Sequence, residues 1–429
     1  MIHGNEHTSA IGWIDFSSAH REKVKTVIDL LASPGVVDEL GIGTIRDSFS
    51  DTLFPGISTI QTRAKYFLTI PRIFRDYKQL RPNERRRLSL ADYLKQQENR
   101  SMICLNQNHK NDPQDGIIGA SFAARRGEVQ RKPSSVYWNG LRTFGLIKTK
   151  LSLQEFVRTF ANPDTPLHDL IRDNDETKGD ASDALESSGP AVNTPAYPVN
   201  WQEPLTLHLT FEEATFLARQ IEARVPESLL GQILMDDTIR TTFVELPDNW
   251  SFADFCDSSP FIDKLSVELK RTLFGARDFW HILKGAHIRY NVLLQRQHGT
   301  DEKWDEFEKK WDEWCEEMSR FPWDRWCTQM IWDLADYYRR QIREFTKRFV
   351  CKWIDSARDG TSNLASLDDL VTQQELQNKK ARARLKPNAE DRVNEWVGID
   401  SLDYRYSQAR RIIKDIHIGL TRQQEKADA

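Results

Sequence analysis

Apolar side chains recur at helical spacing along most of the chain. This spacing predicts helices over 17–32, 58–80, 88–99, 261–296, 302–319, 323–358, 366–385 and 401–420. The clearest run is the last one, where apolar residues repeat at intervals of four and three: Leu402, Tyr406, Ala409, Ile413, Ile416 and Leu420. Strand-like stretches are limited to 146–151 and 204–209, so we expect a mainly α-helical protein. Pro71 lacks a backbone donor and is expected to kink or break its helix.

Residues 173–200 interrupt this pattern. They contain many Asp, Glu, Ser, Gly and Pro residues and almost no large apolar ones. A segment of this composition cannot bury enough apolar surface to offset the entropy of ordering it, so we expect a disordered acidic linker. The linker would separate an N-terminal helical module, residues 1–172, from a C-terminal helical bundle domain, residues 201–429. In that domain, Thr210 and Glu213 form a capping-box pattern that predicts a helix start.

Composition excludes several classes of protein. Of the 429 residues, 39% are apolar and 29% are charged, which is typical of a globular protein with a sizeable core. No apolar run approaches the roughly 20 residues that cross a bilayer, and the first residues lack the pattern of a secretory signal. The five cysteines are dispersed, which favours a reducing compartment. We therefore expect a cytoplasmic protein without membrane contact.

Charged side chains are strongly segregated along the chain, although the formal net charge is only −4. Residues 58–150 contain 19 basic and 7 acidic side chains, a net charge of +12. Residues 151–260 contain 6 basic and 20 acidic side chains, a net charge of −14. Such asymmetry is typical of a module that binds nucleic acid or phosphate beside an acidic one. The alternative is a basic region docked onto the protein's own acidic segment.

Four basic residues of the predicted helix of 58–80 are candidates for phosphate contacts. Lys65, Arg72 and Arg75 follow each other at spacings of seven and three residues, which predicts one side of the helix, and Arg63 precedes them. Each phosphate that such a residue neutralises releases counterions, so binding would depend on salt. The alternative is an ordinary solvated charged face.

The sharpest local pattern is KPSSVYWNGLRTFGLI, residues 132–147. Its Pro-Ser-Ser favours a helix start, and Gly145 is placed to end the helix. Tyr137, Leu141 and Phe144 have the spacing of a buried stripe.

A second face of the same predicted helix contains Ser135, Asn139 and Arg142, and a basic stretch with Lys148 follows it. This arrangement resembles the recognition helix and wing of a winged helix-turn-helix. Asn and Arg are the residue types that make bidentate contacts to adenine and guanine edges. The alternative is a helix that only packs between other elements.

No motif specifies a reaction. The best catalytic candidate is a nuclease-like set of Asp248, Glu268 and Lys270, which could hold a magnesium ion and orient water. Such sites place Glu-x-Lys on a strand, whereas this stretch has helical periodicity. Phosphate-binding glycine loops and closely spaced cysteine pairs are absent, so we expect neither a cofactor nor a metal.

Several strings resemble a family of uncharacterised bacterial proteins, a domain of unknown function that covers nearly the whole chain. The matching strings are GWIDFS at 12–17, DELGIG at 38–43, FPGISTIQTRA at 54–64, SSVYW at 134–138, Gly285-Ala286 with Tyr290-Asn291, and LDYR at 402–405. The resemblance implies a prokaryotic cytoplasmic protein encoded among DNA-handling and anti-phage genes. It supplies no catalytic residues.

Three functions follow from these observations. The leading interpretation is a nucleic-acid-binding or scaffolding component of a bacterial DNA-defence assembly, with protein partners in a multi-subunit system. The second is a protein-interaction subunit whose basic region docks onto an acidic partner without contacting nucleic acid. The third and weakest is a metal-dependent nuclease that uses the acidic pair and lysine described above.

Overall fold

The computed structural model describes residues 38–110, 116–120, 131–162, 190–361, 363–387 and 395–427. Helices form most of these residues, and the β structure within them is one isolated antiparallel bridge between Ile147 and Val192. The prediction of a mainly α-helical protein is therefore confirmed. The helix predicted over 17–32, and residues 173–189 of the predicted linker, lie outside the described residues.

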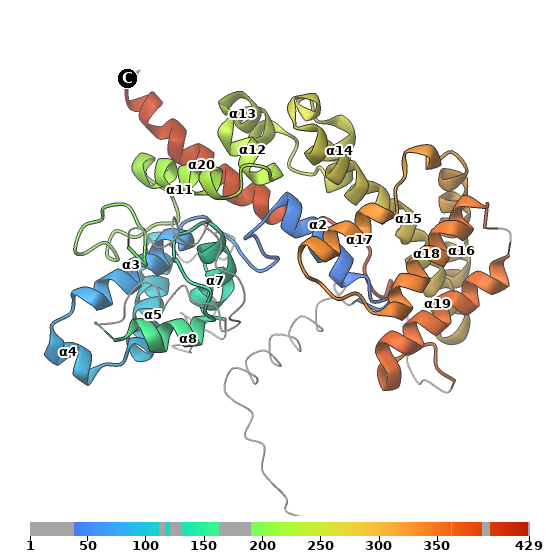
Figure 1. The fold of residues 1–429 in the computed structure, drawn as a ribbon, viewed down its shortest axis with the longest axis horizontal. Helices are drawn as coiled ribbons and strands as arrows, with labels where there is room; N and C mark the ends of the chain where they lie inside the picture. The colour runs from blue at the N-terminus through green and yellow to red at the C-terminus, as the bar shows by residue number, and fades with distance from the viewer. Residues whose placement is uncertain are drawn as a thin grey trace, which may run out of the picture.

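The helices form two lobes joined by a bridge (Figure 1). The N-terminal lobe contains α3 (Tyr66–Gln79), α4 (Pro82–Arg87), α5 (Leu90–Asn108), α7 (Pro133–Thr143) and α8 (Leu153–Phe160). Within it, α3 packs against α5 and α7. Aromatic side chains fill the space between these helices: Phe67 and Phe144 have ring centroids 5.1 Å apart, and Phe74 and Phe156 5.3 Å apart.

The bridge consists of α11 (Phe211–Arg224), α12 (Leu229–Met235), α13 (Asp237–Glu245), α14 (Phe252–Ser258) and the last helix, α20 (Tyr406–Ala427). Helix α20 packs along α11, so the end of the chain returns beside the N-terminal lobe (Figure 1). The Thr210 side chain accepts from the Glu213 backbone, and the Glu213 carboxylate accepts from the Thr210 backbone, so the predicted capping box is confirmed.

The C-terminal lobe contains α15 (Val267–His298), α16 (Asp301–Ser319), α17 (Gln329–Tyr337), α18 (Glu344–Arg358) and α19 (Leu364–Lys379). Short 3₁₀ turns lie at Ile262–Lys264, Trp323–Arg325 and Lys380–Arg382. Three fully buried or nearly buried tryptophans pack together in this lobe: Trp311, Trp314 and Trp353. These side chains are core residues and offer no surface for base stacking.

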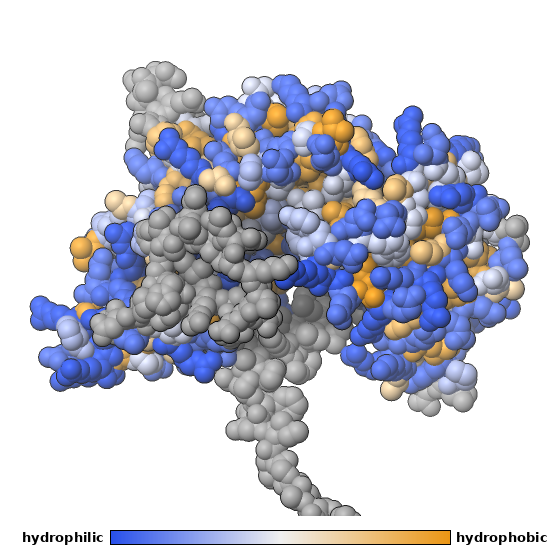
Figure 2. Space-filling view, in the orientation of Figure 1, coloured by the Kyte–Doolittle hydropathy of each residue, from blue (hydrophilic) through white to orange (hydrophobic). Residues whose placement is uncertain are grey.

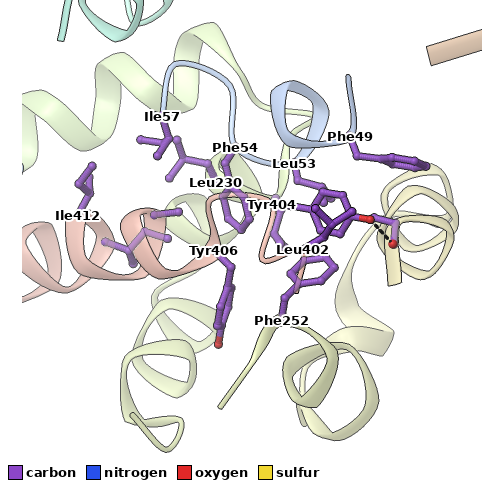
Figure 3. Packing of buried hydrophobic residues seen from close by; sticks show 14 of the residues in the cluster. Phe49, Leu53, Phe54, Ile57, Leu230, Phe252, Leu402, Tyr404, Tyr406 and Ile412 are labelled. Carbon is purple, nitrogen blue, oxygen red and sulfur yellow. Dashed lines mark hydrogen bonds between the residues drawn. The ribbon is translucent and has the colours of Figure 1, made fainter. Parts of the chain in front are cut away.

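Helix α2 (Gly43–Leu53) belongs to the N-terminal part of the sequence but packs against α15 and α17. Its Phe49 and the following Phe54 contact the Tyr404 and Tyr406 rings beside Phe252 (Figure 3). The Tyr404 hydroxyl donates to the Ala276 carbonyl at 2.5 Å. The first and last segments of the described chain therefore share one core with the middle of it.

Several element boundaries differ from those predicted, and three of the differences change the picture. Helix α3 begins at Tyr66, not at 58, and continues through Pro71, at the loss of the hydrogen bond that residue 71 would have donated. The stretch 323–358 divides into a 3₁₀ turn, α17 and α18. Residues 190–200, the end of the predicted linker, lie against the N-terminal lobe, with Val192 and Thr194 buried.

Candidate nucleic-acid interface

Helix α7 has the buried stripe that its sequence predicts. Tyr137, Leu141 and Phe144 are fully buried, and Gly145 ends the helix with a positive φ of 66°. The Tyr137 hydroxyl accepts from the backbone N–H groups of Thr62 and Arg63, both at 2.9 Å. This helix is therefore a packing element of the lobe on that face.

The opposite face of α7 holds the predicted base-contacting residues. Ser135 and Asn139 are exposed. Arg142 is half-buried, and its Nε donates to the Thr149 carbonyl at 3.0 Å, which fixes the loop after the helix. The Lys148 backbone N–H donates to the Ala191 carbonyl at 2.8 Å, beside the isolated bridge.

Lys65 and Arg72 are buried and paired with Glu213. Lys65 Nζ lies 2.7 Å from Glu213 Oε2, and Arg72 Nη2 lies 2.7 Å from Glu213 Oε1. Each of the three side chains is at most 7% exposed. Burial alone would raise the pKa of Glu213, but the two cations hold it below its ordinary value. Burial lowers the pKa of Lys65, although Glu213 opposes this effect. The structure thus corrects the expectation that these two residues lie on a phosphate-facing surface.

Arg63 also faces an acidic residue from far along the chain. Its Nε and Nη2 both donate to the Asp415 carboxylate, at 2.9 and 2.8 Å, and the Ala64 backbone N–H donates to the same group at 2.9 Å. Asp415 lies on α20. The three basic residues in and just before α3 thus hold the N-terminal lobe against the bridge, which is the internal docking that the charge pattern left open as an alternative.

Arg75, by contrast, is exposed and lies at the rim of a pocket. This pocket, called here the Arg75 pocket, has a volume of about 460 Å³ and is bordered by α3, α5 and the segment 196–202. Its lining includes Arg75, Gln79, Gln97, Arg100, Tyr197 and Val199. The Arg75 guanidinium lies over the Tyr197 ring, 5.9 Å from its centroid.

Asp76 fixes the aromatic wall of this pocket. Its carboxylate accepts from the Tyr197 hydroxyl at 2.7 Å and from Trp201 Nε1 at 2.8 Å. Burial, together with this hydrogen bond, raises the pKa of Tyr197 well above its usual range, so the hydroxyl stays a neutral donor. The Tyr197 ring, over which the Arg75 guanidinium lies, is thereby held in place.

The α4 end of the lobe, residues 81–87, adds a dense basic surface next to α3. Arg81, Arg86 and Arg87 are exposed and Arg85 is partly exposed. Within the described residues, none of these four arginines pairs with a carboxylate. Glu84 faces its own helix start, where its side chain accepts from the Arg81 backbone N–H at 2.8 Å. Figure 2 shows hydrophilic side chains covering this end of the lobe.

Sequence reasoning missed this arrangement for two reasons. The run Arg85-Arg86-Arg87 is visible in the sequence, but nothing there shows that it stays unpaired while Lys65 and Arg72 do not. Tyr197 falls within the predicted linker, and Trp201 directly follows it. Aromatic residues at the end of such a stretch are the signal in the sequence that could have indicated an ordered segment.

None of the three nuclease candidates lies on a strand. Glu268 and Lys270 lie in the first turn of the helix α15, and Asp248 lies 3.4 Å from Arg410 and 3.7 Å from Lys414. Within the described residues no group of three or more His, Cys, Asp or Glu side chains converges as a metal site would require. In the same part of the chain, each helix is too short or too polar to cross a membrane.

Comparison with known proteins gives one match. A family model described as Family of unknown function (DUF6361) matches residues 8–418. No curated protein and no solved structure matches the chain.

Proposed function

We propose that this chain, which belongs to the DUF6361 family of unknown function, binds nucleic acid through the α4 end of its N-terminal lobe. The observation that carries the proposal is the contrast between two sets of basic residues. Arg63, Lys65 and Arg72 are neutralised by carboxylates of the bridge. The arginines of the α4 end have no carboxylate partner among the described residues, although they crowd four positive charges into seven positions.

Crowded exposed arginines repel one another, and a polyanion relieves that repulsion. A nucleic acid supplies phosphates at regular spacing, and each contact releases condensed counterions. Arginine also matches phosphate through its planar fork of donors, which lysine lacks. The stretch contributes arginines rather than lysines, so it favours a phosphate-bearing ligand.

Two finer predictions remain part of this proposal. A winged-helix unit over 58–150 would place Ser135 and Asn139 against DNA, and their exposure on α7 supports that contact. In Figure 1, α7 and α4 lie on different sides of the N-terminal lobe, so the two surfaces are separate. Membership in a DNA-handling or DNA-defence assembly, and protein partners within it, stay predictions that rest on the family resemblance.

The proposal is tested by fluorescence anisotropy with a labelled single-stranded oligonucleotide at several salt concentrations. The variant carries Arg86→Ala and Arg87→Ala. The matched control carries Lys309→Ala and Arg320→Ala, two exposed basic residues of the α16 region that pair only with neighbouring glutamates.

We expect wild type and control to show the same salt dependence. If both arginines contact phosphates, the slope of log affinity against log salt becomes shallower by about 1.4 in the variant, or about 0.7 per phosphate of a single strand. Absence of salt-dependent binding by wild type would contradict the proposal. Displacement of the oligonucleotide by poly-glutamate of equal charge, at equal concentration, would instead favour an acidic protein partner.

A further inference from the structure

We propose that the Arg75 pocket binds an unpaired base, so that the protein prefers single-stranded nucleic acid over duplex. This inference rests on the proposed function, because the α4 end would hold the phosphates on either side of that base. It adds a ligand class that the basic surface alone does not specify.

The pocket has the size and position that such a base requires. Its volume of about 460 Å³ lies within the roughly 300–1,000 Å³ of small-ligand pockets. It is a half-open hollow bordered by α3, α5 and the segment 196–202. Leu80 also lines it and directly precedes Arg81 in the chain, so a strand held by the α4 end can reach the pocket.

Arg75 supplies a flat surface for stacking. Its guanidinium lies over the Tyr197 ring, and that ring is held by the hydrogen bond from its hydroxyl to Asp76. The Asp76 carboxylate also accepts from Trp201 Nε1, so its oxygens are occupied by the pocket wall. Bases in single-stranded segments stack on aromatic rings and on the planes of arginine guanidinium groups. In this pocket the Tyr197 ring lies beneath the Arg75 guanidinium and supports it.

Carboxamides offer partners for the edge of the base. Gln79 lies on α3 and Gln97 on α5, and both line the pocket. Among the described residues neither side-chain amide makes a hydrogen bond. The Gln202 amide, by contrast, donates to the backbone carbonyl of Gln97 at 3.1 Å and to Ser101 Oγ at 2.9 Å. Two amides with free donors and acceptors therefore face the space beside the Arg75 plane.

The concave shape favours a single strand. In a duplex the bases are stacked and paired, and the outer surface that meets a protein is convex. A splayed base of a single strand can enter a pocket and present its edge and both faces. Arg100 also lines the pocket; its contact with Glu203 is loose, at 3.6 Å with both side chains more than half exposed, so it is available to an adjacent phosphate.

The test compares two labelled oligonucleotides that carry the same number of phosphates. One is a deoxythymidine oligonucleotide, and the other is its abasic counterpart with no bases. Both are titrated with the full-length protein, its Arg75→Lys variant and an Arg86→Lys control. Lysine keeps the positive charge at each position but removes the guanidinium plane.

We expect wild type to bind the base-bearing strand at least about fivefold more tightly than the abasic one, as base stacking of this kind contributes roughly five- to 150-fold. Arg75→Lys should bring this ratio close to one and leave the abasic affinity unchanged. Arg86→Lys should leave the ratio unchanged. Gln97→Ala should also lower the ratio, which a purely electrostatic role of the pocket would not predict.

The remaining outcomes distinguish a failure of the pocket inference from a failure of the proposed function. Equal, salt-dependent binding of both strands by wild type would overturn the pocket inference and leave the proposed function intact. The deoxythymidine strand is also titrated after annealing to its complement, and tighter binding of that duplex than of the single strand would likewise overturn the inference. Failure of both strands to bind would overturn the proposed function itself.

Discussion

Replacing Glu213 with Gln tests whether Lys65 and Arg72 are structural. The substitution keeps the shape of the side chain and its place in the capping box of α11, but it removes the negative charge. Two buried cations are then left without their counterion. Breaking a buried ion pair on one side destabilises a protein by about 3–5 kcal/mol, because the desolvated partner charge stays unpaired.

The geometry supports the upper part of that range. The Glu213 carboxylate accepts from Lys65 Nζ at 2.7 and 2.9 Å and from Arg72 Nη2 at 2.7 Å, in addition to the Thr210 backbone N–H at 2.9 Å. All three charged side chains are almost completely buried. Water therefore cannot replace the lost charge without opening the contact between α3 and α11.

The measurement is urea denaturation at neutral pH, followed by tryptophan fluorescence. Glu155→Gln is the matched control, because Glu155 closes the capping box of α8 in the same way but is partly exposed and faces no buried cation, so its loss should destabilise the protein far less. Salt should leave the Glu213→Gln effect nearly unchanged, since buried charges are weakly screened. A cost below about 1 kcal/mol, or one that disappears in high salt, would show that the two cations face solvent and are open to phosphates.

Two further predictions concern the C-terminal lobe. Burial lowers the pKa of His287 to about 3. Between pH 6.5 and 3 the unfolded chain therefore binds more protons than the folded one, and the free energy of unfolding falls as the pH falls. His287→Gln should remove about 2 kcal/mol of the stability lost between pH 7 and pH 5, as measured from urea midpoints. An equally steep acid limb in the variant would contradict this account. A Cβ at Gly285 would overlap the Trp314 ring. Gly285→Ala should therefore lower the free energy of unfolding by about 1–3 kcal/mol and change the tryptophan emission. An unchanged emission spectrum would show that the ring can move at no cost.

Local features of this fold could be predicted from the sequence because they depend on neighbours along the chain. The spacing of Tyr137, Leu141 and Phe144, the end of α7 at Gly145 and the capping box of Thr210 are all local patterns. Each is fixed by helix geometry or by hydrogen bonds within one turn, and the structure confirms them.

The candidate site could not be predicted in the same way, because pairing of charges is a property of the folded chain. Lys65 and Arg75 are both basic residues of one segment and look equivalent in the sequence. One meets Glu213, 148 residues away, whereas the contact that the described residues give the other is with the Tyr197 ring. The spacing of charges therefore identified a basic region correctly but could not indicate which of its members remain free to bind a ligand.

Two of the strings that carry the family resemblance, LDYR at 402–405 and Tyr290-Asn291, lie away from the Arg75 pocket. Tyr404 and Arg405 have positive φ values of 49° and 70°, and Arg405 Nη1 donates to the Ile57 carbonyl at 2.8 Å, which fastens the start of α20 to the chain after α2. Asn291 donates to the Val397 carbonyl at 2.9 Å. These residues explain how distant segments share one core, and none of them lines the Arg75 pocket. Family membership therefore points to the shared scaffold, whereas the ligand that we propose depends on the unpaired arginines of the α4 end and on the Arg75 pocket.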